Sequence, residues 1–349
     1  MTSSLYPWQQ TAWAQLQQLK GRWPHAILLH GPEGIGKTEF AESLAKSLLC
    51  EAPQADGQAC ASCVSCGWFA QYSHPDYRRL RPEILETDAP DAEGEDGGKA
   101  SKSEAKASKT PSKEIVINQV RSIAEFMTLS THRQGARVIL LYPAETMNVA
   151  AANALLKSLE EPGPNTVFIL VSNSIEALLP TLISRCHKFA LTMPSPEQAK
   201  AWLAQQEISK PEQFLAEQGG APLAALAASQ SEFLEQQQEF LMHLQRPDLS
   251  NALKIADKLN KTSIPLIISW MQRWLYDIFS YKLAGEIRYY PRYQKEISLI
   301  AANLTVPSLL SLLDANTQRR MSAEHPLAPK LVIEDMLLEY GQQVQKSRS

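Results

Sequence analysis

The sequence lacks the features that mark membrane proteins and strongly charged proteins. Its 349 residues include 34 basic and 37 acidic side chains, so the net charge is only −3. This balance argues against a protein that grips DNA with its whole surface, although it leaves room for local basic patches. The most hydrophobic stretch, residues 264–279, is interrupted by Gln272, Arg273 and Asp277 and is too polar to span a bilayer. We therefore expect a soluble protein without a membrane partner.

A secretory signal is also missing, and cysteine is scarce. Residues 1–6 do not resemble a signal peptide, so we expect a cytoplasmic location, where disulfides are rare. Of five cysteines, four follow the spacing C-x9-C-x2-C-x2-C. These four are Cys50, Cys60, Cys63 and Cys66. The fifth, Cys186, lies far away in the sequence and is expected to be a small packed residue.

The cysteine spacing predicts a zinc site. Two overlapping C-x2-C steps bring thiolates close enough to share one tetrahedral ion, and Cys50 completes the set. Four thiolates leave no coordination position for a substrate, so the predicted zinc is structural. The alternatives are free buried thiols, or disulfides, which a reducing compartment disfavours. An independent zinc-ribbon that binds nucleic acid is a further alternative, but no basic and aromatic cluster surrounds residues 50–66.

Upstream of the cysteines lies a G-x-x-x-x-G-K-T phosphate-binding motif at residues 31–38. A short apolar strand is predicted before it at 26–30 and a helix after it at 39–49. In this setting the glycines let backbone N–H groups wrap a phosphate, the lysine reaches the β and γ phosphates, and the threonine hydroxyl holds Mg²⁺. The residues of the predicted ATP and Mg²⁺ site are Gly31, Gly34, Gly36, Lys37 and Thr38. The alternative is a loop that serves only as a turn.

Strands and helices alternate after the cysteine segment. Helices are predicted at 117–131 and, with Asn148 as its N-cap, at 148–160, and strands at 137–142 and 166–171. Nearly all strand residues are apolar, which indicates an α/β fold whose parallel sheet is covered on both faces. Residues 88–113 contain no aromatic or large aliphatic side chain and predict a flexible surface insertion. The alternative for that segment is an interaction tail.

The last third of the chain is predicted to be all helical. Two short helices in 191–228 suit a small domain, and longer helices fill 229–349. The predicted helices are 233–244, 249–259, 264–283, 293–304, 307–320 and 331–344. Trp270, Trp274 and Ile278 share one stripe of the third helix, which predicts core packing, with a subunit interface as the alternative.

The order of the motifs resembles that of the bacterial DNA polymerase III clamp-loader ATPases. The phosphate loop and the four cysteines are followed by His-Pro-Asp-Tyr at 74–77, by Asn-Ala-Leu-Leu-Lys-Ser-Leu-Glu-Glu-Pro at 153–162, and by Ser-Arg-Cys at 184–186. The resemblance covers roughly residues 1–225. It implies an AAA+ module with the zinc insertion at 1–190, a helical lid at 191–228 and a helical collar at 229–349.

The resemblance also implies partners and a task. Subunits of this family assemble through their collars into a ring-like pentamer, which here would include gamma or tau subunits and a delta subunit. Together they open a sliding clamp and place it on primed DNA. The resemblance therefore implies a subunit of the DNA polymerase III holoenzyme.

The catalytic pattern of the family is incomplete in this chain. Active members have Asp-Glu-Ala after the strand that ends at Leu141, where the Asp positions Mg²⁺ and the Glu orients the attacking water. This chain has Tyr-Pro-Ala at 142–144, and the arginine of the family's Gly-x-x-Arg turn is replaced by Leu223. We expect ATP hydrolysis by the chain itself to be weak or absent. The alternative is an active motor subunit of a clamp loader or of a related AAA+ machine, in which Glu145 or another carboxylate replaces the missing pair.

The resemblance assigns roles to three more residues. Arg185, in the Ser-Arg-Cys motif, would act as an arginine finger on the ATP of an adjacent motor subunit. The alternative is a surface arginine that pairs with a local carboxylate. Ser172 and Asn173, at the end of a predicted strand, are candidates for the polar first-sensor position, with ordinary strand capping as the alternative.

Overall fold

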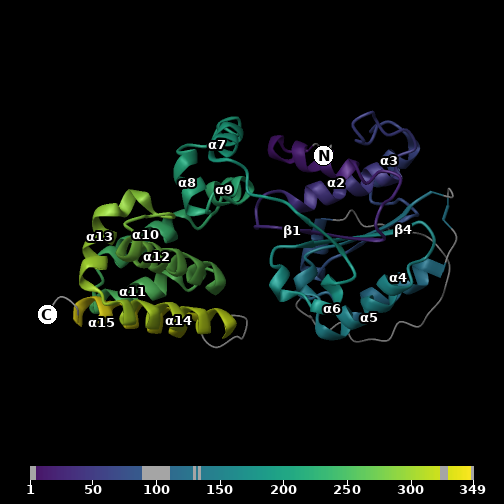
Figure 1. Cartoon of the computed structure of the whole chain (residues 1–349). Helices are drawn as coiled ribbons and strands as arrows, with labels where there is room; N and C mark the ends of the chain where they lie inside the picture. Colours follow the sequence, from purple (N-terminus) through teal and green to yellow (C-terminus); the bar gives the residue numbers. More distant parts are fainter. Residues whose placement is uncertain (1–4, 89–110, 129–130, 133–134, 323–328, 347–349) are drawn as a thin grey trace. The chain divides into compact units, whose positions relative to one another are not determined.

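The structure is a computed structural model, and its chain divides into two compact units, Met1–Ser195 and Pro196–Ser349. It describes residues 5–88, 111–128, 131–132, 135–322 and 329–346. The predicted insertion at 88–113 lies almost entirely outside the described residues. Figure 1 shows the chain coloured along its sequence.

The first unit is built on a five-stranded parallel sheet with the strand order β2-β3-β4-β1-β5. Its strands are β1 (Ala26–His30), β2 (Tyr77–Leu80), β3 (Arg137–Leu141), β4 (Thr166–Ser172) and β5 (His187–Ala190). Every residue of β3 and β4 is buried, as expected for central strands with helices on both faces. Strand β5 was not predicted from the sequence, and its four residues are exposed or half-buried at the edge of the sheet.

Helices cover both faces of this sheet. They are α1 (Gln10–Gln17), α2 (Lys37–Leu49), α3 (Val64–Ala70), α4 (Ile117–Thr128), α5 (Val149–Glu160) and α6 (Pro180–Ile183). Figure 1 shows α2 on one side of the strands and α4, α5 and α6 on the other. Leu28, Ile139 and Phe168 pack against α4 and α5, whereas alternate strand residues face α2 because side chains alternate along a strand. The expected α/β fold class is confirmed.

The predicted helices at 117–131 and 148–160 are both present. Helix α4 is described through Thr128, and residues 129–130 of its predicted extent lie outside the described residues. Helix α5 has the predicted N-cap, because the side-chain oxygen of Asn148 accepts a hydrogen bond of 2.9 Å from the backbone N–H of Ala151. This bond satisfies one of the N–H groups that have no partner within the first turn of a helix.

The second unit begins with three short helices rather than the two predicted. They are α7 (Pro196–Ala204), α8 (Pro211–Glu217) and α9 (Pro222–Ser229), which pack around a small cluster that includes Leu203, Phe214 and Ala225. Two helices were too few, because the breaks before Pro211 and at Gly219 and Gly220 divide the segment into three. Pro222 follows them and begins another helix, which suits proline because the first turn needs no N–H donor there.

The remaining helices form an all-helical bundle, as predicted. They are α10 (Leu234–Gln245), α11 (Leu249–Leu259), α12 (Ile264–Ala284), α13 (Gln294–Asn303), α14 (Val306–Ser322) and α15 (Pro329–Lys346). Trp270, Trp274 and Ile278 on α12 are 3%, 0% and 0% exposed, so the predicted core role of this stripe is confirmed. The indole N–H of Trp274 donates to the hydroxyl of Tyr340, which donates to the carbonyl of Leu244, at 2.9 Å each. This relay joins α12, α15 and α10.

Removing the Tyr340 hydroxyl is expected to destabilise the bundle. Tyr340→Phe leaves a buried indole N–H and a buried carbonyl without this partner, so the free energy of unfolding should fall by about 1–3 kcal/mol. Urea unfolding of the full chain measures the change. Tyr276→Phe, at a tyrosine of α12 that is 39% exposed, is the matched control and should change little. Equal losses in both variants would contradict a specific role for the relay.

Among the described residues, no single helix is long and apolar enough to cross a membrane. The helices Pro291–Asn303 and Val306–Met321 meet the criterion only as a pair, and the pair is bent by 114°. Both contribute side chains such as Ile300 and Leu312 to the core of the bundle.

Candidate nucleotide site, metal centre and arginine

The phosphate-binding motif forms a tight loop between β1 and α2. Gly36 has a φ of 83°, and a Cβ atom at this position would lie 2.6 Å from the ring of Tyr6. A Cβ on Gly31 would collide with the carbonyl oxygen of Leu191, and Gly34 has a φ of 76°. Only glycine suits such close approaches and left-handed conformations. The three glycines of the motif therefore lie where the backbone is left-handed or closely packed.

Lys37 is the first residue of α2 and is 4% exposed. Its ammonium donates a hydrogen bond of 2.5 Å to the carbonyl of Pro32. Burial lowers the pKa of Lys37 to about 8, an effect that the negative charges of Glu145, Glu33 and Glu39 partly oppose. A phosphate would be a stronger partner than a neutral carbonyl because hydrogen bonds between ionised groups are the strong ones.

Thr38 occupies the second position of α2. The N–H groups in the first turn of a helix have no intrahelical partners, and they carry the positive end of the helix dipole. Together with Lys37, this helix start can bind an anion. The structure thus brings the five predicted ligand-binding residues of the loop together at one end of α2.

The end of β3 carries no carboxylate at the two positions where active members of the family have one. Tyr142 and Pro143 follow Leu141, and Tyr142 is only 9% exposed. Burial raises the pKa of Tyr142, and the cations Arg79 and Arg81 partly oppose that shift. At the position where the resemblance implies the Mg²⁺-binding Asp of active members, this chain therefore has a neutral phenol.

Glu145 lies closer to the candidate nucleotide site than its position in the sequence indicates. One carboxylate oxygen accepts a hydrogen bond of 3.0 Å from the backbone N–H of Asn173, and its charge acts on Lys37. The other oxygen is buried without a hydrogen-bond partner among the described residues. Glu145 and Asn173 are 28 positions apart, so the contact depends on the pairing of β3 with β4 and was missed by sequence reasoning.

Ser172 and Asn173, the two candidates for the first-sensor position, differ in burial. Ser172 is the last residue of β4, is fully buried, and accepts a hydrogen bond of 3.1 Å from the backbone N–H of Ser174. Its hydroxyl therefore serves the end of its own strand, as the strand-capping alternative describes. Asn173 follows the strand and is exposed.

The four clustered cysteines form one compact group. Their sulfur atoms all lie within 4.8 Å of one another, and Cys50 lies 3.5 Å from Cys60 and 4.0 Å from Cys63. Four sulfurs at 2.3 Å from a central zinc would be about 3.8 Å apart in an ideal tetrahedron. Cys186 is not part of this group and packs against the core between the sheet and helices α4 and α5. The donor set fits a structural zinc ion.

Backbone N–H groups point at three of these sulfur atoms. The N–H of Cys60 donates to the sulfur of Cys50 at 3.2 Å. The N–H of Cys63 donates to the sulfur of Cys60 at 3.3 Å, and that of Cys66 to the sulfur of Cys63 at 3.4 Å. Hydrogen bonds from Ser62 lower the pKa of Cys60 to about 6, whereas burial raises the pKa of Cys50 and Cys66. A divalent cation would favour the thiolate form of all four.

The cysteine segment is tied to α2 and to the His-Pro-Asp-Tyr motif. The hydroxyl of Ser47 donates to the carbonyl of Gly57, and the hydroxyl of Ser65 donates to the carbonyl of Leu49, at 2.5 Å each. Ser65 also contacts Nε2 of His74 at 2.8 Å, and Nδ1 of His74 accepts from the N–H of Asp76 at 3.0 Å. The candidate metal centre and the phosphate loop therefore lie at opposite ends of α2.

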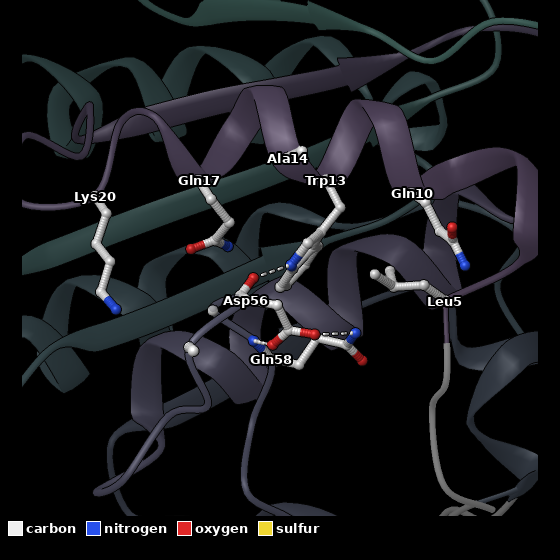
Figure 2. Close-up of a pocket in the computed structure, with 10 residues that line it drawn as sticks. Leu5, Gln10, Trp13, Ala14, Gln17, Lys20, Asp56 and Gln58 are labelled. Carbon is white, nitrogen blue, oxygen red and sulfur yellow. Dashed lines mark hydrogen bonds between the residues drawn. The ribbon is translucent and has the colours of Figure 1, made fainter.

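A cavity of about 710 Å³ borders the cysteine segment at residues 55–58. Figure 2 shows that α1 forms one wall and the turn around Asp56 the other, with the indole N–H of Trp13 directed at the carbonyl of Asp56, 2.9 Å away. Gln10, Gln17 and Gln58 add side-chain amides. Its lining includes no residue of the phosphate loop and none of the four cysteines, so it is separate from both candidate sites.

Arg185 follows α6 and its side chain is 33% exposed. One guanidinium nitrogen donates to the carbonyl of Thr181 at 2.8 Å, and another forms an ion pair with Glu160. In this structure the arginine thus pairs with a local carboxylate, the alternative considered from the sequence. A surface ion pair of this kind is worth about 0–1 kcal/mol, so it would not hold the side chain against a stronger anion.

Comparison with known proteins places the chain within the clamp-loader subunits. The sequence motifs favour one of these subunits in particular, delta prime. The family described as "DNA polymerase III, delta subunit" matches residues 8–195, and the one described as "DNA polymerase III, delta subunit, C terminal" matches residues 231–342. DNA polymerase III subunit delta' of Pseudomonas aeruginosa is 37% identical over 290 residues, which cover 81% of this chain and 80% of that protein. The chain belongs to the delta prime family.

A second relative carries the same name as the first. DNA polymerase III subunit delta' of Haemophilus influenzae is 32% identical over 290 residues, which cover 80% of this chain and 79% of that protein. A solved structure, a DNA polymerase III gamma subunit-related protein from Thermotoga maritima, aligns at a TM-score of 0.44 and 17% identity and covers 95% of this chain and 99% of its own. The resemblance to delta prime drawn from the motifs is confirmed by the sequence matches.

Proposed function

We propose that this delta prime family member is a non-motor subunit of a clamp loader. It helps to open the sliding clamp and place it on primed DNA, and it supplies Arg185 to the ATP site of a neighbouring ATPase subunit. One observation carries the proposal: a complete phosphate loop faces a strand end that offers Tyr142 and Pro143 in place of two carboxylates. Phosphoryl transfer requires a positioned metal and a positioned water, so this site suits holding ATP rather than hydrolysing it.

The other parts of the chain have supporting roles in this proposal. Residues 1–190 are the AAA+ module, with zinc bound by the four cysteines as a structural element, residues 191–228 are the lid, and residues 229–349 are the collar. Through the collar the chain joins gamma or tau subunits and a delta subunit, in the cytoplasm. In this proposal the chain therefore takes part in assembling the clamp loader and assists ATP hydrolysis by a neighbouring subunit.

The isolated chain is expected to bind ATP without appreciable turnover. Lys37→Ala should raise the Kd for ATP by about tenfold or more, because a hydrogen bond between charged groups is lost. Lys46→Ala, in the last turn of the same helix, is the matched control and should bind ATP as the unaltered chain does. Equilibrium binding of a fluorescent ATP analogue and a phosphate-release assay measure the two quantities. Equal binding by both variants would remove the phosphate loop from the proposal.

An active motor is the second candidate, and the placement of Glu145 favours it. This carboxylate lies near Lys37 and has one buried oxygen without a hydrogen-bond partner among the described residues. A motor would use it for the metal or the attacking water. If the isolated chain hydrolyses ATP at the rate of motor subunits and Glu145→Ala abolishes this, the second candidate replaces the first.

The decisive test is ATP hydrolysis by the chain alone and after mixing with the other loader subunits, clamp and primed DNA. We expect no turnover by the chain alone and hydrolysis by the mixture that depends on Arg185. If the mixture hydrolyses ATP at the same rate with and without this chain, the proposed assistance in trans is contradicted.

A further inference from the structure

The carbonyl side of the phosphate loop is held by residues 6–9, which precede α1. The side-chain amide nitrogen of Gln9 donates to the carbonyls of Ile35, at 3.1 Å, and Gly36, at 2.7 Å. The indole N–H of Trp8 donates to the same Ile35 carbonyl at 2.9 Å. Three hydrogen bonds from outside the loop therefore converge on two consecutive loop carbonyls.

The orientation of the Gln9 amide is fixed by its partners. Its oxygen accepts a hydrogen bond of 3.1 Å from the backbone N–H of Tyr6, while its nitrogen faces the two carbonyls. A reversed amide would set oxygen against oxygen at the carbonyls and nitrogen against N–H at Tyr6. The side chain is 2% exposed, so these bonds are shielded from water. Gln9 is thus a buried, fully engaged polar residue.

Holding the carbonyls determines where the N–H groups point. In a trans peptide the C=O of one residue and the N–H of the next point in opposite directions. Because the carbonyls of Ile35 and Gly36 are turned toward Gln9, the N–H groups of Gly36 and Lys37 are turned away from it. They belong to the N-terminus of α2, where consecutive N–H groups bind phosphate.

The aromatic rings beside Gln9 fill the rest of the space. The rings of Tyr6 and Trp8 are stacked at 4.9 Å with an angle of 3° between their planes. The Tyr6 ring lies where a side chain at position 36 would have to go. The segment therefore fits a loop that has glycine at position 36.

We propose that Gln9, assisted by Trp8, is a positioning residue that holds the phosphate loop in its anion-binding conformation before a nucleotide arrives. The proposal rests on the proposed binding of ATP at Lys37 and Thr38, and it names the residues that prepare that site. Gln9 contacts the loop carbonyls, so it acts through the loop. A loop prepared in this way binds phosphate without first having to be ordered, which favours affinity.

The test uses variants that remove the donors in two ways. Gln9→Met keeps the length of the side chain and removes both the donor and the acceptor. Gln9→Glu keeps an acceptor for the Tyr6 N–H but sets a carboxylate oxygen against the two carbonyls. Gln10→Glu is the matched control, because it adds the same charge at the next, exposed residue. Trp8→Phe removes a single donor while keeping an aromatic ring.

Two measurements on the full chain are compared: the Kd for ATP, and hydrogen exchange of the loop amides at 34–38 without nucleotide. We expect both Gln9 variants to raise the Kd and to speed loop exchange by about tenfold or more, as the loss of two hydrogen bonds implies. Trp8→Phe should show a smaller change in the same direction. Gln10→Glu should match the unaltered chain within about twofold on both measurements.

Each outcome decides the proposal. Loop exchange in Gln9→Met that equals that of the unaltered chain overturns it, and so does faster exchange with an unchanged Kd. If the unaltered chain binds no ATP, the proposed nucleotide role fails, and exchange alone then decides whether Gln9 holds the loop. If Gln9→Glu does not fold, Gln9→Met and Trp8→Phe give the same comparison without a buried charge.

Discussion

Replacing Arg185 with alanine is expected to leave a reconstituted clamp loader assembled and to slow its ATP hydrolysis. A guanidinium can donate two parallel hydrogen bonds to a γ-phosphate and stabilise the charge that develops during phosphoryl transfer. Removing such an arginine costs about 10³–10⁵ in rate at the site it serves. In the proposed arrangement one chain serves one neighbouring site, so the whole complex should lose the share of hydrolysis that depends on that site.

The local contacts of Arg185 are compatible with this role. Its partner Glu160 is 49% exposed, and a pair of this kind is worth about 0–1 kcal/mol. A phosphate group of higher charge would compete well for the same guanidinium. Glu160→Gln should therefore release the arginine without slowing hydrolysis, whereas Arg185→Lys should slow it because an ammonium lacks the planar fork.

Steady-state hydrolysis with clamp and primed DNA measures these effects, and gel filtration reports assembly. Arg121→Ala, at an exposed arginine on α4, is the matched control and should leave both unchanged. A complex that falls apart in Arg185→Ala would make this residue a structural contact. A complex that assembles and hydrolyses ATP at the normal rate would leave Arg185 with only its local pairing to Glu160.

The parts of the fold that the sequence predicted well are those with strong local signals. The stretch Ala26–His30 is apolar and is followed by glycines, and the structure places β1 at these residues. Helix α11 also has the predicted bounds, Leu249–Leu259, because its apolar residues recur on one face and Asp248 caps its start. Periodicity and capping are short-range properties, so a single sequence displays them.

The parts that were missed depend on tertiary context. Strand β5 alternates weakly and has charged residues, and its pairing with β1 gives it a place at the sheet edge. The contact of Glu145 with Asn173 arises only when β3 and β4 lie side by side. The role of Gln9 could not be read from the sequence because glutamine at a helix start is common, and its partners are 26 and 27 positions away.

The candidate site likewise has some residues that local sequence signals predicted and some contacts that only the fold revealed. The glycines, Lys37 and the cysteines were predicted from spacing, because phosphate loops and thiolate sites use closely spaced residues. The pairing of Arg185 with Glu160 joins residues 25 positions apart and required the fold. A motif thus identifies the ligand-binding atoms, while the fold identifies the groups that hold or restrain them.

Loss of the metal centre is expected to have the largest effect on stability. We expect about one zinc per purified chain, and Cys60→Ser or a strong chelator should remove it. Residues 51–56 of the module are exposed, so little apolar burial holds the segment together without an ion. The binding free energy of a structural zinc is then largely folding free energy of the module.

The loss should spread from the module into the first unit through α2. Cys50 ends this helix, and Ser47 and Ser65 tie the cysteine segment to its last turn. Each kcal/mol lost lowers the melting temperature of a unit of this size by about 2–4 °C, so removal of the ion should lower it by about 5 °C or more. Cys186→Ser, at a thiol outside the cluster, is the control and should keep the zinc. Protein prepared without chelator that contains no zinc, or a Cys60→Ser variant that melts with the unaltered chain, would mean that the four thiols pack the segment by themselves.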